Sequence, residues 1–129
     1  MSGPSIAPLD LLIVDDSASI RKILQRVLQK AEVPIRNVYE AGDGVEALAI
    51  LRANKVNVIF TDINMPNMDG LQLLNHIRAN DEWKDVPVIM LTTEGSQAKV
   101  MEAAQLGAAR YVRKPFTADQ VHDLLLRLF

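Results

Sequence analysis

Four short apolar segments of the chain end in polar side chains that could carry out chemistry together. Crowded carboxylates raise one another's pKa values, and a hard divalent cation such as Mg²⁺ relieves this repulsion. A carboxylate beside such a cation is a reasonable nucleophile toward phosphorus, and a nearby hydroxyl and ammonium can hold phosphoryl oxygens. These residue types therefore indicate phosphoryl transfer onto an aspartate. The polar side chains are, in chain order, Asp15, Asp16, Asp62, Thr92 and Lys114.

The apolar segments are typical of strands in a parallel sheet. They contain consecutive apolar residues rather than alternating ones, which favours strands that are buried on both faces. The clearest is 9–14, which ends at Asp15-Asp16. A weaker strand is expected at 37–41. The other predicted strands are 56–62, 86–91 and 109–112.

The sequence between the predicted strands has helical periodicity. Apolar residues recur at intervals of three and four, most clearly at 20–28 and 121–128, and each set forms one stripe on a helix. Three helices begin with a side-chain acceptor that is followed three residues later by an acid or an amide. Gly107 is placed to end the fourth helix. The capping pairs are Asp43 with Glu46, Asp69 with Gln72, and Thr117 with Gln120.

Alternating strands and helices predict an α/β fold. Five strands and five helices indicate a doubly wound, five-stranded parallel sheet with helices on both faces. In such sheets, ligands bind beyond the carboxyl ends of the strands, near the point where the strand order reverses. The polar side chains named above all follow the carboxyl end of a predicted strand. This edge of the sheet is therefore the candidate functional site.

The composition describes one domain with little net charge. The chain has 129 residues, with 14 basic and 16 acidic side chains, so no overall field favours nucleic-acid binding. The lack of cysteine excludes disulfides, thiolate metal sites and cysteine nucleophiles. No apolar run approaches the ~20 residues that span a bilayer, and residues 1–8 are expected to be a disordered lead-in. We therefore expect a cytoplasmic protein that binds neither membranes nor nucleic acid directly.

Each of these features has an ordinary structural explanation when it is taken alone. An Asp-Asp pair after a strand is usually a solvated turn or a helix cap. Tyr111 alone predicts a half-buried aromatic side chain of a strand. His76 and His122 lie in helical segments with no partner at ligand spacing, so we expect both on the surface. The joint occurrence of acids, a hydroxyl and a lysine at successive strand ends favours a functional site over these explanations.

Four sequence motifs resemble the receiver domain of two-component response regulators, in particular its CheY-like single-domain type. The resemblance covers residues 9–129, nearly the whole chain. It implies the flavodoxin-like strand order 2-1-3-4-5, which is the order of CheY itself. It also implies a cis peptide bond between Lys114 and Pro115. The motifs are LLIVDDS, TDINMPNMDG, PVIMLTTEG and YVRKPF.

The resemblance implies how the site would bind phosphate and metal. Asp62 would be the phosphoacceptor, supplied by a sensor histidine kinase, and Lys114 would bind the phosphoryl group. Mg²⁺ would be the cofactor, with Mn²⁺ as a substitute. Asp16 and Asp62 would bind the metal directly, Asp15 would bind it through water, and Asn64 would offer its backbone carbonyl.

The resemblance also implies a switch and a limited lifetime of the phosphorylated form. Thr92 would move toward the phosphoryl oxygens, and Tyr111 would turn inward to fill the vacated space. This is a population shift, because the hydroxyl gains a charge-assisted hydrogen bond only after phosphorylation. Asn64 and Glu94 would flank the path of an attacking water, which implies loss of phosphate in seconds to minutes.

The expected partners are proteins. The resemblance places the readout surface on the fourth helix, fifth strand and fifth helix, roughly residues 96–129, where a downstream protein would dock. Lys99, Arg110 and Arg113 make part of this face basic, and Glu102 interrupts it. We expect a stand-alone, chemotaxis-type regulator that is monomeric before phosphorylation. The alternative is a receiver cut from a larger regulator with an output domain.

Three other functions share parts of the pattern. Phosphatases of the haloacid-dehalogenase type also use a strand-end aspartate with Mg²⁺, but their second acid is replaced here by Asn64, which has no proton to donate. We therefore expect a phosphoacceptor rather than an enzyme. A pseudo-receiver would lack part of the acceptor set, and the acidic loop DDSAS would repel the phosphate of FMN in a flavodoxin. Ile63 stands where several CheY-like proteins have tryptophan, so we expect weak quenching of Trp83 by metal.

Overall fold

The computed structural model describes residues 7–92, 97–108 and 110–129, and within these ranges five strands alternate with five helices. All strand pairs are parallel, and the order across the sheet is β2-β1-β3-β4-β5, as predicted. Most of the expected lead-in, residues 1–6, lies outside the described residues. The elements are β1 (Leu9–Val14), α1 (Ala18–Lys30), β2 (Ile35–Ala41), α2 (Gly44–Ala53), β3 (Val58–Asp62), α3 (Gly70–Ala79), β4 (Val88–Thr92), α4 (Gln97–Gln105), β5 (Arg110–Arg113) and α5 (Ala118–Leu128).

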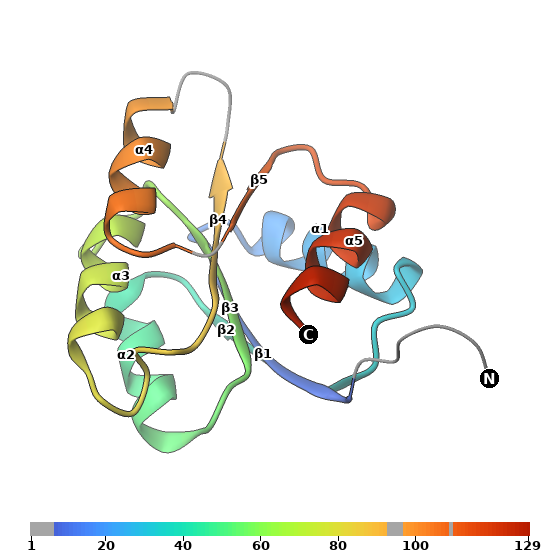
Figure 1. Ribbon diagram of the computed structural model, residues 1–129, viewed down its shortest axis with the longest axis horizontal. Coiled ribbons are helices and arrows are strands. Elements are labelled where there is room, and N and C mark those ends of the chain that lie inside the picture. Colours follow the sequence, from blue (N-terminus) through green and yellow to red (C-terminus); the bar gives the residue numbers. More distant parts are fainter. Residues whose placement is uncertain (1–6, 93–96, 109) are drawn as a thin grey trace.

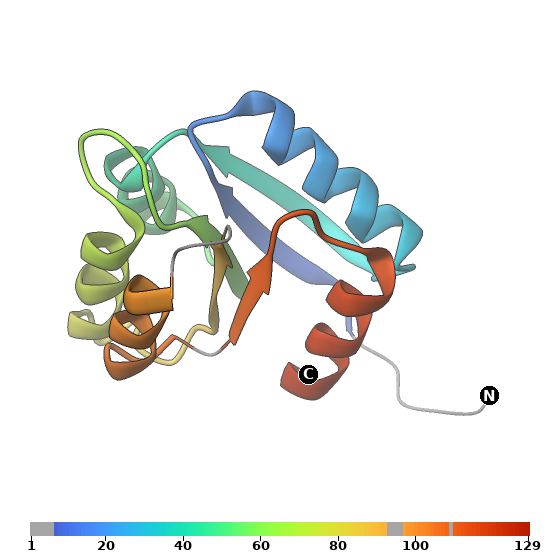
Figure 2. The same cartoon turned by 90° about the horizontal axis from the view of Figure 1, so that it is seen from above.

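The helices form two layers with the sheet between them. Helices α1 and α5 contact each other on one face, and α2, α3 and α4 line up on the other, as Figures 1 and 2 show. Each face has its own apolar core. Within these ranges, the helices are too short to cross a membrane.

Strands β1, β3 and β4 are mostly apolar because both of their faces are covered. In β1, Leu11 and Ile13 pack into the core under α1 and α5, whereas Leu12 and Val14 pack into the core under α2 and α3. All four side chains are fully buried. Full burial of one such side chain stabilises the fold by about 1.5–3 kcal/mol. The central strands are therefore rigid supports for the residues that follow them.

Two predicted strands begin later in the structure than in the sequence analysis. Strand β3 begins at 58 rather than 56. The Asp10 amide of β1 donates its hydrogen bond to the Asn57 side chain, at 2.7 Å, instead of to a backbone carbonyl of the neighbouring strand. Strand β4 begins at 88 rather than 86, after Pro87, which has no N–H to donate. Strand β2 begins two residues earlier than predicted, at Ile35. This edge strand is only partly buried, so its first residues do not form the apolar run from which a strand is predicted.

The predicted helix caps are present. Asp69 with Gln72, and Thr117 with Gln120, form reciprocal capping boxes. Asp43 accepts a hydrogen bond from the Glu46 amide at 2.9 Å. The Glu46 carboxylate does not return to the Asp43 amide and instead accepts from the amide of Gly42. Gly107 follows α4 with φ +93°, a conformation that favours glycine.

A polar cluster holds the amino-terminal end of the sheet, opposite the candidate site. The Asp10 carboxylate in β1 is buried and accepts hydrogen bonds from the Arg36 guanidinium and from Asn37 Nδ2. These bonds lower the pKa of Asp10, first through Arg36 and then through Asn37. The cluster fixes the register of β1 against β2 where the pairing shifts, between Leu9 and Asp10.

Arg78, at the end of α3, connects three segments of the chain. Its guanidinium donates two hydrogen bonds to the Gly107 carbonyl, at 3.0 and 2.7 Å. It also donates to the carbonyls of Lys84 and Val86, at 3.2 and 2.8 Å. Burial lowers the pKa of Arg78, and Asp85 partly opposes this effect. One side chain thus joins α3, the turn before β4, and the connection from α4 to β5.

Candidate functional site

The carboxyl ends of β1 and β3 bring three acids together. Val14 pairs with Thr61 in the sheet, so the residues that follow them, Asp15 and Asp62, leave adjacent strands side by side. One carboxylate oxygen from each of Asp15, Asp16 and Asp62 lies within 4.8 Å of the other two. The predicted acid cluster is therefore present.

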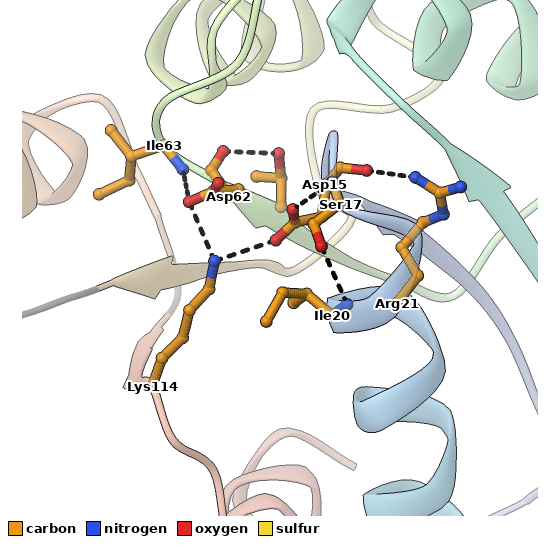
Figure 3. A network of polar contacts seen from close by, with 8 residues as sticks. Asp15, Ser17, Ile20, Arg21, Asp62, Ile63 and Lys114 are labelled. Carbon is orange, nitrogen blue, oxygen red and sulfur yellow. Dashed lines mark hydrogen bonds and ion pairs between the residues drawn. The ribbon is translucent and has the colours of Figure 1, made fainter.

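Asp15 is the buried acid of the cluster, and both of its carboxylate oxygens accept hydrogen bonds. Oδ1 accepts from the Ser17 amide at 2.9 Å, and Oδ2 accepts from Lys114 Nζ at 3.0 Å (Figure 3). Its backbone carbonyl accepts from the Arg21 guanidinium, which also pairs with Glu40 at 2.9 Å. These contacts fix the turn that leads from β1 into α1.

Asp62 is more open than Asp15, and its side chain is 15% exposed. Its Oδ1 accepts a hydrogen bond from the Ile63 amide at 2.8 Å and lies 3.6 Å from Lys114 Nζ. Burial raises the pKa of Asp62, and the charges of Asp15 and Asp16 raise it further, while Lys114 and the Ile63 amide oppose the shift. The Asp62 carboxyl group is thus partly buried beside two other acids, and among the described residues the ammonium of Lys114 lies next to it.

Lys114 reaches the acids from the loop after β5. Its side chain is only 17% exposed, and its ammonium lies between Asp15 and Asp62 (Figure 3). Its backbone amide donates to the Thr92 carbonyl at 2.7 Å, which joins the ends of β4 and β5. The Lys114–Pro115 peptide bond is cis, as the family resemblance implied.

The loop that follows Asp62, residues 63–69, is held tightly; we call it the acceptor loop. A Cβ on Gly70 would lie 2.2 Å from the Asp62 carbonyl oxygen, so only glycine fits there. The Asn67 side chain, on a residue with φ 65°, donates to Asp43 at 2.7 Å. The amide of Gly44 donates to the Met68 carbonyl at 3.1 Å. The acceptor loop is therefore anchored to the start of α2.

The remaining predicted residues surround this centre at different depths. Thr92 is buried at the end of β4, next to the strand that carries Asp62. Asn64 is exposed on the acceptor loop, where its side chain accepts a hydrogen bond from Lys99 of α4. Glu94 lies outside the described residues. Tyr111 is 61% exposed rather than half-buried; it lies on the edge strand β5, where it lines a pocket beside α4.

The donor atoms of the cluster suit a hard cation. All three are carboxylate oxygens, the ligand type that Mg²⁺ prefers, and part of the cluster remains open to water, which Mg²⁺ retains when bound. Among the described residues, neither histidine belongs to a metal-binding group: His76 is exposed and His122 is partly exposed. Both positions agree with the prediction.

Several residues that shape the site were not predicted. Ser17 caps α1 and orients Asp15, and Arg21 holds the Asp15 carbonyl. The serine that follows Asp15-Asp16 is a sequence signal for this cap. Gly70, directly after the cap residue Asp69, is a signal for a close approach of the backbone. No local pattern in the sequence indicates the contact between Lys99 and Asn64.

The sequence matches the family described as the response regulator receiver domain over residues 11–126. It is 40% identical over 121 residues to the chemotaxis protein CheY-3 of Vibrio cholerae, covering 94% of this chain and 92% of that protein.

Solved structures share the fold. The chemotaxis response regulator CheY4 of Vibrio cholerae has a TM-score of 0.82 at 36% identity, covering 95% of this chain and 100% of that one. The receiver domain of a Pseudomonas aeruginosa sensor histidine kinase, which holds a magnesium ion in its active site cleft, has a TM-score of 0.81 at 26% identity, covering 94% of this chain and 97% of that one. With the strand order, the acid cluster and the lysine in place, this chain belongs to the response regulator receiver domain family.

Proposed function

We propose that this protein is a signalling switch that takes a phosphoryl group from a histidine kinase onto Asp62. The observation that carries the proposal is the position of Asp62, whose carboxylate lies 3.6 Å from the Lys114 ammonium and within 4.8 Å of ligand oxygens of Asp15 and Asp16. Family membership supports this function over that of a haloacid-dehalogenase phosphatase.

The transfer step follows from the chemistry of these groups. A carboxylate oxygen of Asp62 attacks the phosphorus of a phosphohistidine, so that an O–P bond forms and the N–P bond breaks. The electron pair of the broken bond stays with the imidazole nitrogen. Lys114 neutralises charge on the phosphoryl oxygens, since its ammonium already contacts the acceptor.

The acids have a second task in this proposal, which is to hold the metal. Asp15, Asp16, Asp62 and the backbone carbonyl of Asn64 would hold Mg²⁺, which supplies positive charge against the repulsion between carboxylate and phosphoryl group. Asp15 is itself held by Ser17 and Lys114, so its orientation is set before metal binds.

The signal would leave the site through Thr92 and Tyr111. A pocket of about 450 Å³ lies between α4 and β5, with Tyr111 at its wall and apolar side chains such as Val100 and Ala103 lining it. A Tyr111 ring that turns inward has this space available. Thr92 favours the inward state when its hydroxyl donates to a phosphoryl oxygen, because that bond exists only after phosphorylation.

The output surface would be the face formed by α4, β5 and α5. A protein partner that binds the state with Tyr111 inward would bind the phosphorylated protein more tightly than the unphosphorylated one. The similarity to chemotaxis response regulators favours a chemotaxis-type partner. We expect the unphosphorylated protein to be a monomer.

The test is phosphorylation by a small donor. Acetyl phosphate with Mg²⁺ should add one phosphoryl group to the wild-type protein, detected by intact mass. Asp62→Asn should add none, and Asp81→Asn, at a side chain that is 98% exposed, should behave as wild type. Equal labelling of Asp62→Asn would refute the proposal.

A further inference from the structure

Lys99 of α4 and Asn64 of the acceptor loop are joined by a hydrogen bond from Nζ to Oδ1. The two residues are 35 positions apart in the chain, and both are exposed. Asn64 is two positions beyond the proposed phosphoacceptor. This contact therefore connects a helix of the proposed output face to the immediate surroundings of Asp62.

The backbone of the acceptor loop is already fixed without Lys99. Asn67 is bonded to Asp43, the Met68 carbonyl is bonded to Gly44, and the Ile63 carbonyl accepts from Gly70 at 2.7 Å. An exposed carboxamide on a fixed backbone can still rotate about its side-chain bonds. Within the described residues, Lys99 is the group that restrains this rotation at Asn64.

The restraint determines which half of the carboxamide is available. A carboxamide has one accepting oxygen and one donating NH₂ group. With Oδ1 engaged by the ammonium of Lys99, Asn64 has its donating half available for the phosphoryl oxygens or the oxygen of an approaching water. Without Lys99, the carboxamide would occupy both orientations and several rotamers.

We propose that Lys99 is a positioning residue that sets the lifetime of the Asp62 acyl phosphate by orienting Asn64. This inference rests on the function proposed above. In the hydrolysis, the oxygen of water forms a bond to phosphorus, the bond between phosphorus and the Asp62 oxygen breaks, and the carboxylate leaves with the electron pair. The attacking water passes its proton to solvent. The NH₂ group of Asn64 donates hydrogen bonds to the phosphoryl oxygens, and Lys99 holds the carboxamide in the orientation that allows this.

The size of the effect follows from the cost of fixing one side chain. Immobilising a single rotamer-rich side chain corresponds to a factor of about 2 to 10 in rate. Lys99→Met should therefore lengthen the lifetime of the phosphorylated form about threefold or more. Lys99→Arg keeps a donor at the end of a long side chain and should restore most of the wild-type rate.

The experiment is a double-mutant cycle on hydrolysis. Wild type, Lys99→Met, Asn64→Ala and the double variant are loaded with acetyl phosphate and Mg²⁺, the donor is removed, and loss of the phosphoryl group is followed by intact mass. Lys99→Met should slow the loss in the wild-type background and leave it unchanged in the Asn64→Ala background. Lys30→Met, at an exposed lysine in the last turn of α1, is the matched control for removal of one charge and should hydrolyse as wild type.

Three results would overturn the inference. One is a wild-type lifetime in Lys99→Met. Another is an equal effect of Lys99→Met in the Asn64→Ala background, which would mean that the charge acts without Asn64. The third is an equal effect of Lys30→Met. A wild-type protein that takes up no phosphoryl group refutes the proposed function as well, whereas normal uptake with an unchanged lifetime refutes this inference alone.

Discussion

Lys114 Nζ donates a hydrogen bond to Asp15 Oδ2 at 3.0 Å, and the two residues are 99 positions apart in the chain. Asp15 is buried, and its carboxylate oxygens are hydrogen-bonded to this partner and to the Ser17 amide. A buried charge that loses its partner is costly, because neither water nor protein then compensates it. The contact therefore contributes both to the stability of the fold and to the geometry of the acid cluster.

The first prediction concerns the loss of this cation. Lys114→Met should lower the free energy of unfolding by about 1–3 kcal/mol at neutral pH without Mg²⁺, because a buried carboxylate loses a charged hydrogen bond. Urea unfolding measures the difference. Lys84→Met is the control, since the side chain of Lys84 is 53% exposed and its ion pair with Asp81 is long, at 3.8 Å. Equal losses in the two variants would contradict the prediction.

The second prediction concerns metal. Mg²⁺ should raise the melting temperature of the wild-type protein, because a ligand that binds only the folded state stabilises that state. At a ligand concentration of 100 times the Kd, the free energy of unfolding increases by about 2.7 kcal/mol. Asp16→Asn removes one negative charge from the cluster and should reduce the gain. Asp81→Asn should keep it. Melting curves of the wild type that are identical with Mg²⁺ and with EDTA would show that the cluster does not bind the metal.

The third prediction concerns pH and the amino-terminal end of the sheet. Arg36 and Asn37 hold the pKa of Asp10 below its ordinary value of 3.8, so the folded state favours the ionised carboxylate. The stability that this provides is fully present above pH 3.8 and is lost as the pH falls through the lower folded pKa. Asp10→Asn should therefore be less stable than wild type at pH 7, and the difference should shrink at pH 3. Urea unfolding at both pH values measures it, and a constant difference would contradict it.

The fourth prediction concerns the close approach at Gly70. Gly70→Ala should destabilise the protein by about 1–3 kcal/mol and slow phosphorylation, because the new Cβ would push the Asp62 carbonyl, 2.2 Å away. Gly42→Ala is the matched control, since its Cβ would meet only the flexible end of Glu46, at 3.2 Å. Thermal melting and acetyl phosphate labelling test both variants. A Gly70→Ala protein with wild-type stability would show that the acceptor loop can shift freely.

The fifth prediction concerns fluorescence. Trp83 lies in a pocket with Lys55 and Val56, which precede β3, whereas Asp62 is the last residue of that strand. The length of the strand separates the indole from the acid cluster, since each residue of a strand adds about 3.3 Å. Mg²⁺ should therefore quench the emission of Trp83 weakly at most, at concentrations that raise the melting temperature. Strong quenching would contradict this placement.

The fold was predictable because its strongest signals are local. Apart from Asp10, the run 9–14 is apolar and contains neither glycine nor proline, and it forms β1 with the predicted boundaries. Asp69 and Thr117 each precede a glutamine at the right spacing, and both form capping boxes. The start of β3 was less predictable, because it depends on Asn57 reaching Asp10 across 47 positions.

The site was predictable in its acids and its lysine for a different reason. Asp15, Asp62 and Lys114 follow strand ends, and the topology of a parallel sheet brings such residues to one edge. Features that depend on how helices and strands are placed in space could not be predicted from the sequence. Lys99 meets Asn64 because α4 packs beside α3, and Tyr111 is exposed on β5, the last strand of the sheet.

Arg78 has a practical consequence for anyone who modifies this domain. Its guanidinium donates hydrogen bonds to the carbonyls of Gly107, Lys84 and Val86, so one side chain holds both the turn before β4 and the segment that leads into β5. An epitope tag or fluorescent reporter inserted in that turn would pull on the far connection as well. Engineers who want to leave the output surface undisturbed should place such insertions elsewhere.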